Sequence, residues 1–172
     1  MGFESPPSLV HTLQTIVPVS LIFLSGVSAC LSLWVMPLTQ LLPPKQAARQ
    51  SFQTVVWGGQ YLQSSARALA ASLLITTVLT SQLADPKESA KWKTWAFCTV
   101  LLPLVAPYEI KLIFPLNDRI DDLGRKMEAG EELDAVERRE LTQCFKSWGH
   151  LNYGRVALPL VSGVVALLNR SS

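Results

Sequence analysis

From Leu13 to Met36 the chain carries no charged side chain. A helix needs roughly 20 consecutive apolar residues to cross the hydrocarbon core of a bilayer, and this stretch is longer than that. Charged residues make up only 16% of the whole chain, against about 25% in an ordinary soluble domain. The sequence therefore predicts an integral membrane protein whose first span covers residues 13–36.

Three further apolar stretches follow the first span. They predict a second span at residues 68–84, a third at 94–114 and a fourth at 151–168. The second helix is expected to begin earlier than its span, near Phe52. Pro103 and Pro107 interrupt the third span, which is tolerated where other groups satisfy the freed carbonyls, so we expect a kink that faces a cavity. We predict a single all-α membrane domain over residues 1–172, built as a four-helix bundle.

The connection between the third and fourth spans is predicted to be helical. One short helix is expected from Asn117 to Glu128, with Gly130 ending it. Asp134 is followed three residues later by Glu137, which is the form of a capping box, so the fourth helix is expected to begin outside the membrane. The charged run over residues 131–140 is most simply a solvated face.

The distribution of basic residues predicts the orientation in the membrane. Four spans place both termini and the loop 85–93 on one face, and the connections 37–51 and 115–150 on the other. The terminal face carries Lys87, Lys91, Lys93 and Arg170, whereas the other carries Lys45, Arg49, Arg119, Arg125, Lys126, Arg138, Arg139 and Lys146. By the positive-inside rule the connection 115–150 is expected to be cytoplasmic.

Polar residues gather on both sides of that connection. The segment 115–120 closes the third span, and the segment 148–155 opens the fourth. Trp148, Asn152 and Arg155 have the spacing of one helical stripe, and a polar stripe on a span should face the protein interior. The alternative for Arg155 is that its side chain extends to the membrane interface.

Glu109 lies near the end of the third span, at a depth similar to that of Arg155. A glutamate side chain is too short to reach water easily from there, so it needs a cation, and Arg155 and Arg67 are the candidates. Glu109 could form a buried pair that fixes helix register. It could instead be a carboxylate tuned as a proton acceptor by a partly dry pocket.

Several classes of site lack the residues they need. His11 and His150 are the only histidines and are expected on opposite faces, which disfavours a His-rich metal or haem site. No C-x-x-C pair occurs among Cys30, Cys98 and Cys144, which argues against a dithiol redox enzyme. The pair Gly58-Gly59 lacks the rest of a phosphate-binding motif. If the protein is an enzyme, we expect it to work without metal, flavin or nicotinamide.

The segments P-L-N-D-R-I at 115–120 and W-G-H-L-N-Y-G-R at 148–155 resemble the small four-span membrane family that includes the anthrone oxygenases of polyketide pathways. Chain length, span number and the aromatic residues early in the second helix also agree. The chain departs from the usual family pattern at three positions. Leu116 stands in place of Thr, Asp118 in place of a second Asn, and Asn152 where many members have His.

The resemblance implies an oxygenase that converts a polyketide anthrone to the anthraquinone with molecular oxygen as co-substrate and no added cofactor. Such a substrate supplies its own electrons once deprotonated, so the protein needs a base, an environment that stabilises the anion and an apolar pocket. His150 is the leading candidate base, with Glu109 and Asp118 as alternatives. The candidate anion-binding residues are Asn117, Arg119, Asn152 and Arg155, and those that could stack on a flat ring are Trp57, Tyr61, Tyr108 and Trp148.

Two other functions fit the same residues. In a membrane scaffold or accessory subunit, the polar groups would hold helices together. A small transporter is the second alternative, but the chain shows no internal repeat of the kind that transporters commonly display. The expected partners are an aromatic polyketide substrate and the lipid bilayer, with no nucleic acid. The expected location is the endoplasmic reticulum or another internal membrane.

Overall fold

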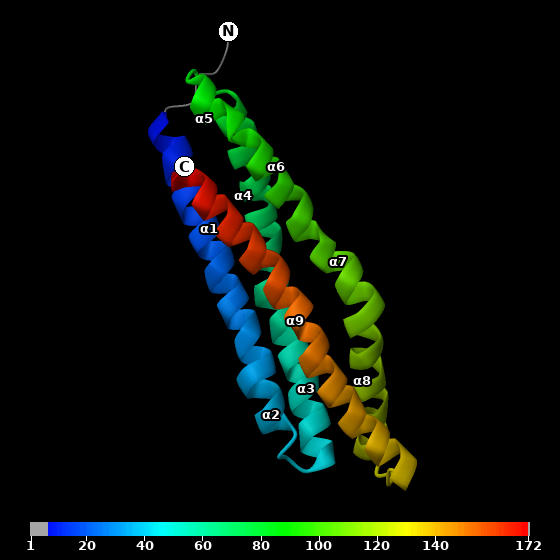
Figure 1. The fold of residues 1–172 in the computed structure, drawn as a ribbon. Helices are drawn as coiled ribbons and strands as arrows, with labels where there is room; N and C mark the ends of the chain where they lie inside the picture. The colour runs from blue at the N-terminus through cyan, green and yellow to red at the C-terminus, as the bar shows by residue number, and fades with distance from the viewer. Residues whose placement is uncertain (1–6, 172) are drawn as a thin grey trace. The chain divides into compact units, whose positions relative to one another are not determined.

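A computed structural model describes residues 7–171 of the chain. The described residues form helices and no strand, which confirms the predicted all-α class (Figure 1). Four helical stretches are long and apolar enough to cross a membrane: Ser8–Thr39, Pro44–Ser81, Pro86–Glu128 and Ala135–Arg170. The chain is therefore a multi-pass membrane protein.

Each of the first three stretches combines α-helical parts with short π-helical or 3-10 parts, which are labelled η. The elements are α1 (Pro7–Cys30), η1 (Leu31–Val35), α2 (Met36–Thr39), α3 (Pro44–Gly58), η2 (Gly59–Gln63), α4 (Ser64–Ser81), α5 (Pro86–Ala90), α6 (Trp92–Leu101), η3 (Leu102–Leu104), α7 (Val105–Tyr108), η4 (Glu109–Ile113), α8 (Phe114–Glu128) and α9 (Ala135–Ser171). Of these, η3 is a 3-10 helix, and η1, η2 and η4 are π-helical.

The second long helix begins earlier than the sequence suggested. It starts at Pro44 rather than near Phe52, so most of the connection expected over residues 37–51 is helical. Pro43 has an extended ψ of 143° and Pro44 takes the first helical position. Proline is favoured there because the first N–H groups of a helix have no partner within it. Helix α4 ends at Ser81, so residues 82–84 of the expected span lie beyond it.

Prolines account for two of the π-helical segments. Pro37 and Pro115 each lie two residues beyond the end of one, η1 and η4 respectively. A proline ring clashes with the carbonyl four residues before it in a regular α-helix. That carbonyl belongs to Leu33 in η1 and to Lys111 in η4. A wider turn at these positions moves the carbonyl away from the ring.

The chain divides into two compact units. The first comprises described residues 7–25, 64–105 and 157–171, and in it α4 packs against α6. Gly163 permits a close approach, because a Cβ there would lie 2.8 Å from the Pro18 carbonyl oxygen. The buried apolar residues of this unit are Val17, Leu21, Leu73, Trp95, Cys98, Leu102 and Ala166.

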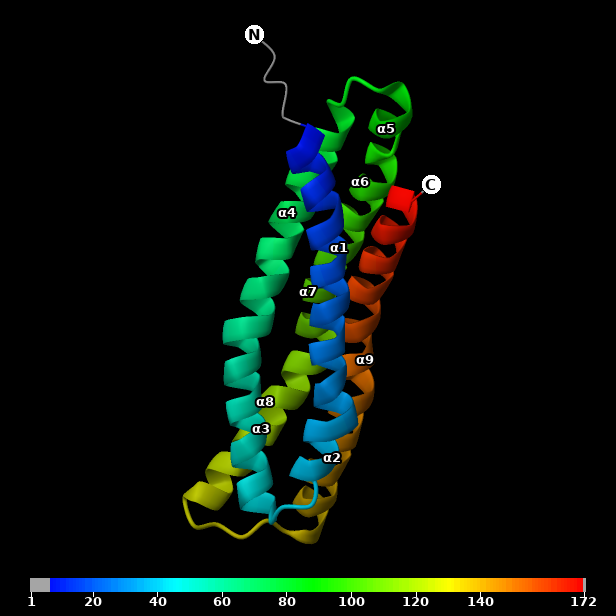
Figure 2. The ribbon, with the colours of Figure 1, turned by 90° about the vertical axis from the view of Figure 1, so that its left-hand side faces the viewer.

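The second unit comprises residues 26–63 and 106–156 and contains every residue that the sequence proposed for the site. Within it α3 packs against α8, where a Cβ at Gly124 would lie 3.2 Å from that of Ala48. The turn from α2 to α3 and the connection from α8 to α9 lie at the same end of this unit (Figures 1 and 2). Its buried apolar residues are Met36, Ala47, Ala48, Ile113, Ile120, Leu123, Leu133, Leu141, Cys144, Phe145 and Trp148.

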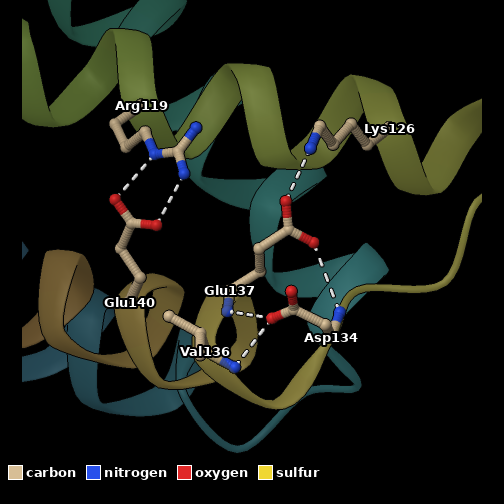
Figure 3. Close-up of polar contacts among 6 residues, drawn as sticks. All are labelled: Arg119, Lys126, Asp134, Val136, Glu137 and Glu140. Carbon is tan, nitrogen blue, oxygen red and sulfur yellow. Dashed lines mark hydrogen bonds and ion pairs between the residues drawn. The ribbon is translucent and has the colours of Figure 1, made fainter.

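The connection from α8 to α9 has the predicted structure. Helix α8 covers the expected residues, and Gly130 follows it with a φ of 89°, a left-handed conformation that favours glycine. The carboxylate of Asp134 accepts hydrogen bonds from the backbone N–H groups of Val136 at 2.7 Å and Glu137 at 2.8 Å. The Glu137 carboxylate accepts one from the backbone N–H of Asp134 at 3.3 Å (Figure 3). This reciprocal pair confirms the capping box.

Candidate functional site

A buried ion pair between η4 and α9 lies at the centre of the candidate site. Nε of Arg155 is 2.5 Å from Oε1 of Glu109, and the side chains are only 12% and 8% exposed. Removing two charges from water is costly unless they compensate each other closely, which this geometry achieves. Of the two cations that the sequence offered to Glu109, Arg155 is the partner.

Asn152 extends this pair to the first long helix. Its amide nitrogen donates to the Ser28 carbonyl and to the Ser32 hydroxyl, both at 2.9 Å. Its amide oxygen accepts a hydrogen bond of 3.4 Å from Nη1 of Arg155. Asn152 is fully buried. Its polar atoms are thus engaged in holding Arg155 and the first helix together.

Gln63 connects the pair to the second long helix. Its amide nitrogen lies 3.4 Å from Oε2 of Glu109, whereas Nε of Arg155 contacts Oε1. The polar network therefore joins residues from all four long helices. Its members are Ser28, Ser32, Gln63, Glu109, Asn152 and Arg155.

Sequence reasoning missed Gln63, Ser28 and Ser32. Within residues 7–171, the three π-helical segments each contribute one network member: η1 contains Ser32, η2 contains Gln63 and η4 contains Glu109. Segments of this kind occur often at functional sites because the extra residue in the turn re-aims a side chain. Pro37 and Pro115 signal the wide turns η1 and η4, since each follows one at the same distance, but no proline follows η2 at that distance to signal the turn that contains Gln63.

Tyr108 brings α7 into close contact with α9. Its hydroxyl donates a hydrogen bond of 2.5 Å to the backbone carbonyl of Leu151. A Cβ at Gly154 would overlap the Tyr108 ring, so only glycine leaves room for the ring at this position. From the sequence, Tyr108 is a candidate to stack on the flat ring of a substrate. In the structure, its ring packs against α9.

The two segments that resemble the anthrone oxygenases contact each other. Nε1 of Trp148 donates to the side-chain oxygen of Asn117 at 2.8 Å, and Trp148 is buried in the apolar core of the second unit. Arg119 forms a two-pronged ion pair with Glu140, with nitrogen–oxygen distances of 2.7 and 2.6 Å (Figure 3). These contacts hold α8 against α9.

Two ion pairs, Arg119–Glu140 and Lys126–Glu137, join α8 to α9 near their connection. Both lie outside the predicted spans 94–114 and 151–168. The hydrogen bond from Arg119 lowers the pKa of the Glu140 carboxyl. The hydrogen bond from Lys126 likewise lowers the pKa of Glu137, which also accepts one from the Asp134 backbone (Figure 3). Both glutamates are therefore held in the charged form.

Four of the proposed site residues belong neither to the polar network nor to the contacts of Tyr108, Asn117, Trp148 and Arg119 described above. His150 is exposed, with Nδ1 at 2.7 Å from the Lys146 carbonyl, and Asp118 is also exposed. Trp57 and Tyr61 stack on each other, with ring centroids 5.4 Å apart, and are about half exposed at 55% and 54%. Among residues 7–171, no group of three or more His, Cys, Asp or Glu side chains is placed to hold a metal ion.

The network combines the groups that proton transfer to and from an organic acid requires. Glu109 can accept a proton, and Arg155 can stabilise a negative charge beside it. Glu109 is buried and Arg155 is mostly shielded from water, so their interactions with a bound molecule would be weakly screened.

Comparison with known proteins identifies the family. The model of the anthrone oxygenase family matches residues 52–165, well over half of the chain. The matched region contains Gln63, Glu109, Asn152 and Arg155 and both resembling segments. No curated protein and no solved structure matches the chain. On the strength of the family match, the chain is a member of the anthrone oxygenase family.

Proposed function

We propose that the protein is a membrane-embedded oxygenase that converts an anthrone to the corresponding anthraquinone with molecular oxygen and no added cofactor. The observation that carries the proposal is the buried Glu109–Arg155 pair, which lies inside the region that matches the anthrone oxygenase family. In the overall reaction, the ring methylene and one O₂ give a ring carbonyl and one water.

The first step is removal of a methylene proton by the Glu109 carboxylate. This step converts Glu109 to its neutral form and the anthrone to a delocalised anion. Arg155 then exchanges its ion pair with Glu109 for one with the oxygen of that anion. The number of buried charges stays the same throughout, so no charge is left uncompensated in a dry site.

The substrate anion then supplies the electrons. It transfers one electron to O₂, and the resulting radical and superoxide combine to form a carbon–oxygen bond. Glu109 returns its proton to the terminal peroxide oxygen. The carboxylate next removes the second proton from the same carbon as the oxygen–oxygen bond breaks, which forms the carbonyl and releases hydroxide. Hydroxide takes up that proton and leaves as water.

This proposal moves the base from His150 to Glu109. His150 is exposed and lies outside the polar network, whereas Glu109 is buried against a cation and an amide donor. The proposal also changes the role of Asn152. Because both ends of its amide are already hydrogen-bonded within the protein, Asn152 orients Arg155 and is not a direct ligand of the substrate.

The test is anthraquinone formation by the purified protein in detergent, measured against spontaneous oxidation of the same anthrone under oxygen. We expect the wild-type protein to accelerate the reaction, and with ¹⁸O₂ one labelled atom should enter the new carbonyl. Treatment with a chelator and removal of any flavin should leave the rate unchanged. An unaccelerated reaction with wild-type protein contradicts the proposal and favours the scaffold.

Two variants decide between the bases. Glu109→Gln keeps the size of the side chain but cannot accept the proton, so we expect turnover to fall by on the order of 10²-fold or more. His150→Ala tests the alternative. If His150→Ala loses turnover and Glu109→Gln keeps it, the base is the histidine.

A further inference from the structure

Tyr108 contacts the turn of α9 that carries Arg155. In an α-helix the carbonyl of residue 151 accepts the backbone N–H of residue 155. The Tyr108 hydroxyl donates to that same Leu151 carbonyl at 2.5 Å. One residue later in the chain, Glu109 reaches the side chain of Arg155. Tyr108 is thus the chain neighbour of Glu109, and its hydroxyl binds the turn of α9 that carries Arg155.

Gly154 provides the space for this contact. Any side chain there would overlap the tip of the Tyr108 ring, so the ring can lie in its present position against α9 only because residue 154 is glycine. Gly149 lies on the same helix and makes a useful comparison. A Cβ there would meet the nearest atom, Cβ of Met36, at 3.9 Å, which is an ordinary contact.

The wide turn that follows makes the position of Glu109 sensitive to this contact. Tyr108 ends α7, and the π-helical segment η4 begins at Glu109, whose carbonyl accepts the backbone N–H of Phe114. A slip of one helical turn along α9 is about 5.4 Å. Such a slip would separate the Glu109 and Arg155 atoms that now lie 2.5 Å apart.

We infer that Tyr108 is a positioning residue: its hydroxyl on Leu151 and its ring against Gly154 fix the register that brings Glu109 to Arg155. The kinetic part of this inference rests on the proposed oxygenase activity. The dependence of the Glu109–Arg155 ion pair on Tyr108 does not require that activity.

The first test uses thermal stability and needs no substrate. Glu109→Gln and Arg155→Met, singly and together, measure how strongly the two side chains are coupled. The same cycle is then measured with Tyr108→Phe, which keeps the ring and removes only the hydroxyl. We expect the non-additive change in Tm to shrink by at least half in the Tyr108→Phe background. Unchanged coupling would overturn the inference.

The second test uses turnover of an anthrone under oxygen. A misplacement of about 1 Å can cost on the order of 10²-fold in rate. We therefore expect Gly154→Ala and Tyr108→Phe to lower kcat by at least 10-fold while KM changes by less than about 3-fold. The matched control, Gly149→Ala, should stay within about 2-fold of wild type, since it adds the same methyl group to the same helix without a close contact.

The outcomes separate the two proposals. Equal losses in Gly149→Ala and Gly154→Ala would overturn the positioning role, because the effect would then come from any added methyl group on α9. If Gly154→Ala does not fold, Tyr108→Phe still decides, since it adds no volume. If the wild-type protein does not oxidise anthrones, the proposed function fails while the stability cycle still tests the role of Tyr108.

Discussion

The indole nitrogen of Trp148 donates a hydrogen bond to the side-chain oxygen of Asn117 at 2.8 Å, which joins α9 to α8. Each residue belongs to one of the two segments that resemble the anthrone oxygenases. Trp148 is 1% exposed, so its ring is part of the apolar core. A residue that marks the family in the sequence therefore serves to hold two helices together.

Removal of the Asn117 side chain should destabilise the protein. Asn117→Ala leaves the buried Trp148 nitrogen without its acceptor, which costs about 1–3 kcal/mol. The measurement is the midpoint of denaturation of the purified protein. Asp118→Ala is the control, since Asp118 is the exposed neighbour on the same helix, and we expect it to change stability by less than about 0.5 kcal/mol. Equal effects in the two variants would contradict the role of this hydrogen bond.

The Glu109–Arg155 pair should show strong coupling. Arg155→Met alone strands a buried carboxylate, at a cost of about 3–5 kcal/mol. Adding Glu109→Gln removes that stranded charge, so the double variant should be more stable than Arg155→Met. Thermal unfolding of the two single variants and the double variant is the measurement. If their effects simply add, the two charges do not interact in the folded protein.

Asn152→Ala should weaken the network on two sides. The change removes the donor to Ser28 and Ser32 and the acceptor for Arg155. We expect a loss of stability of about 1–3 kcal/mol, because buried polar groups are left without partners. We also expect lower kcat for anthrone oxidation, since Arg155 loses the group that orients it. If Asn152→Ala is as stable as the wild-type protein, these hydrogen bonds do not stabilise the fold.

The ion pairs of the α8–α9 connection predict a dependence on pH. Arg119 lowers the pKa of Glu140 in the folded protein. The resulting stabilisation is present above the ordinary glutamate pKa and is lost as the pH falls through the lowered value of the folded state. Wild-type protein should therefore have a higher Tm than Glu140→Gln at neutral pH, and the difference should disappear in acid.

High salt provides the control for this pH effect. Arg119 and Glu140 are 37% and 40% exposed, so added salt should screen their attraction and reduce the difference in Tm at neutral pH. A difference that persists in acid would assign the effect of Glu140→Gln to packing and not to charge.

The parts of the fold that could be predicted from sequence depend on local chemistry. The absence of charges predicted the first span, the apolar composition of three further stretches predicted the others, and the spacing of Asp134 and Glu137 predicted the capping box. The depth of Glu109 predicted a buried cation as its partner, and the helical spacing of Trp148, Asn152 and Arg155 predicted their common inward stripe. Each of these follows from residues close together in the chain or from the cost of an unpaired charge.

The parts that could not be predicted depend on contacts between distant residues. Gln63 and Ser32 carry no charge, so nothing in their own sequence context marks them as partners of Glu109 and Asn152. The π-helical turns rotate the residues that follow them, which changes the side chains that face inward. Arg119 was expected to bind an anion of the substrate. The structure pairs it with Glu140, whose charge belongs to a run that was interpreted as a solvated face.

The most direct test of the central claim is the initial rate of anthraquinone formation, compared between wild-type protein and Glu109→Gln at equal folded concentration under saturating oxygen. If the buried carboxylate removes the methylene proton, the wild-type protein accelerates the reaction well above the spontaneous rate, and Glu109→Gln retains about 1% of that acceleration or less. Equal acceleration by the two proteins would contradict the account, because proton removal would then not require Glu109.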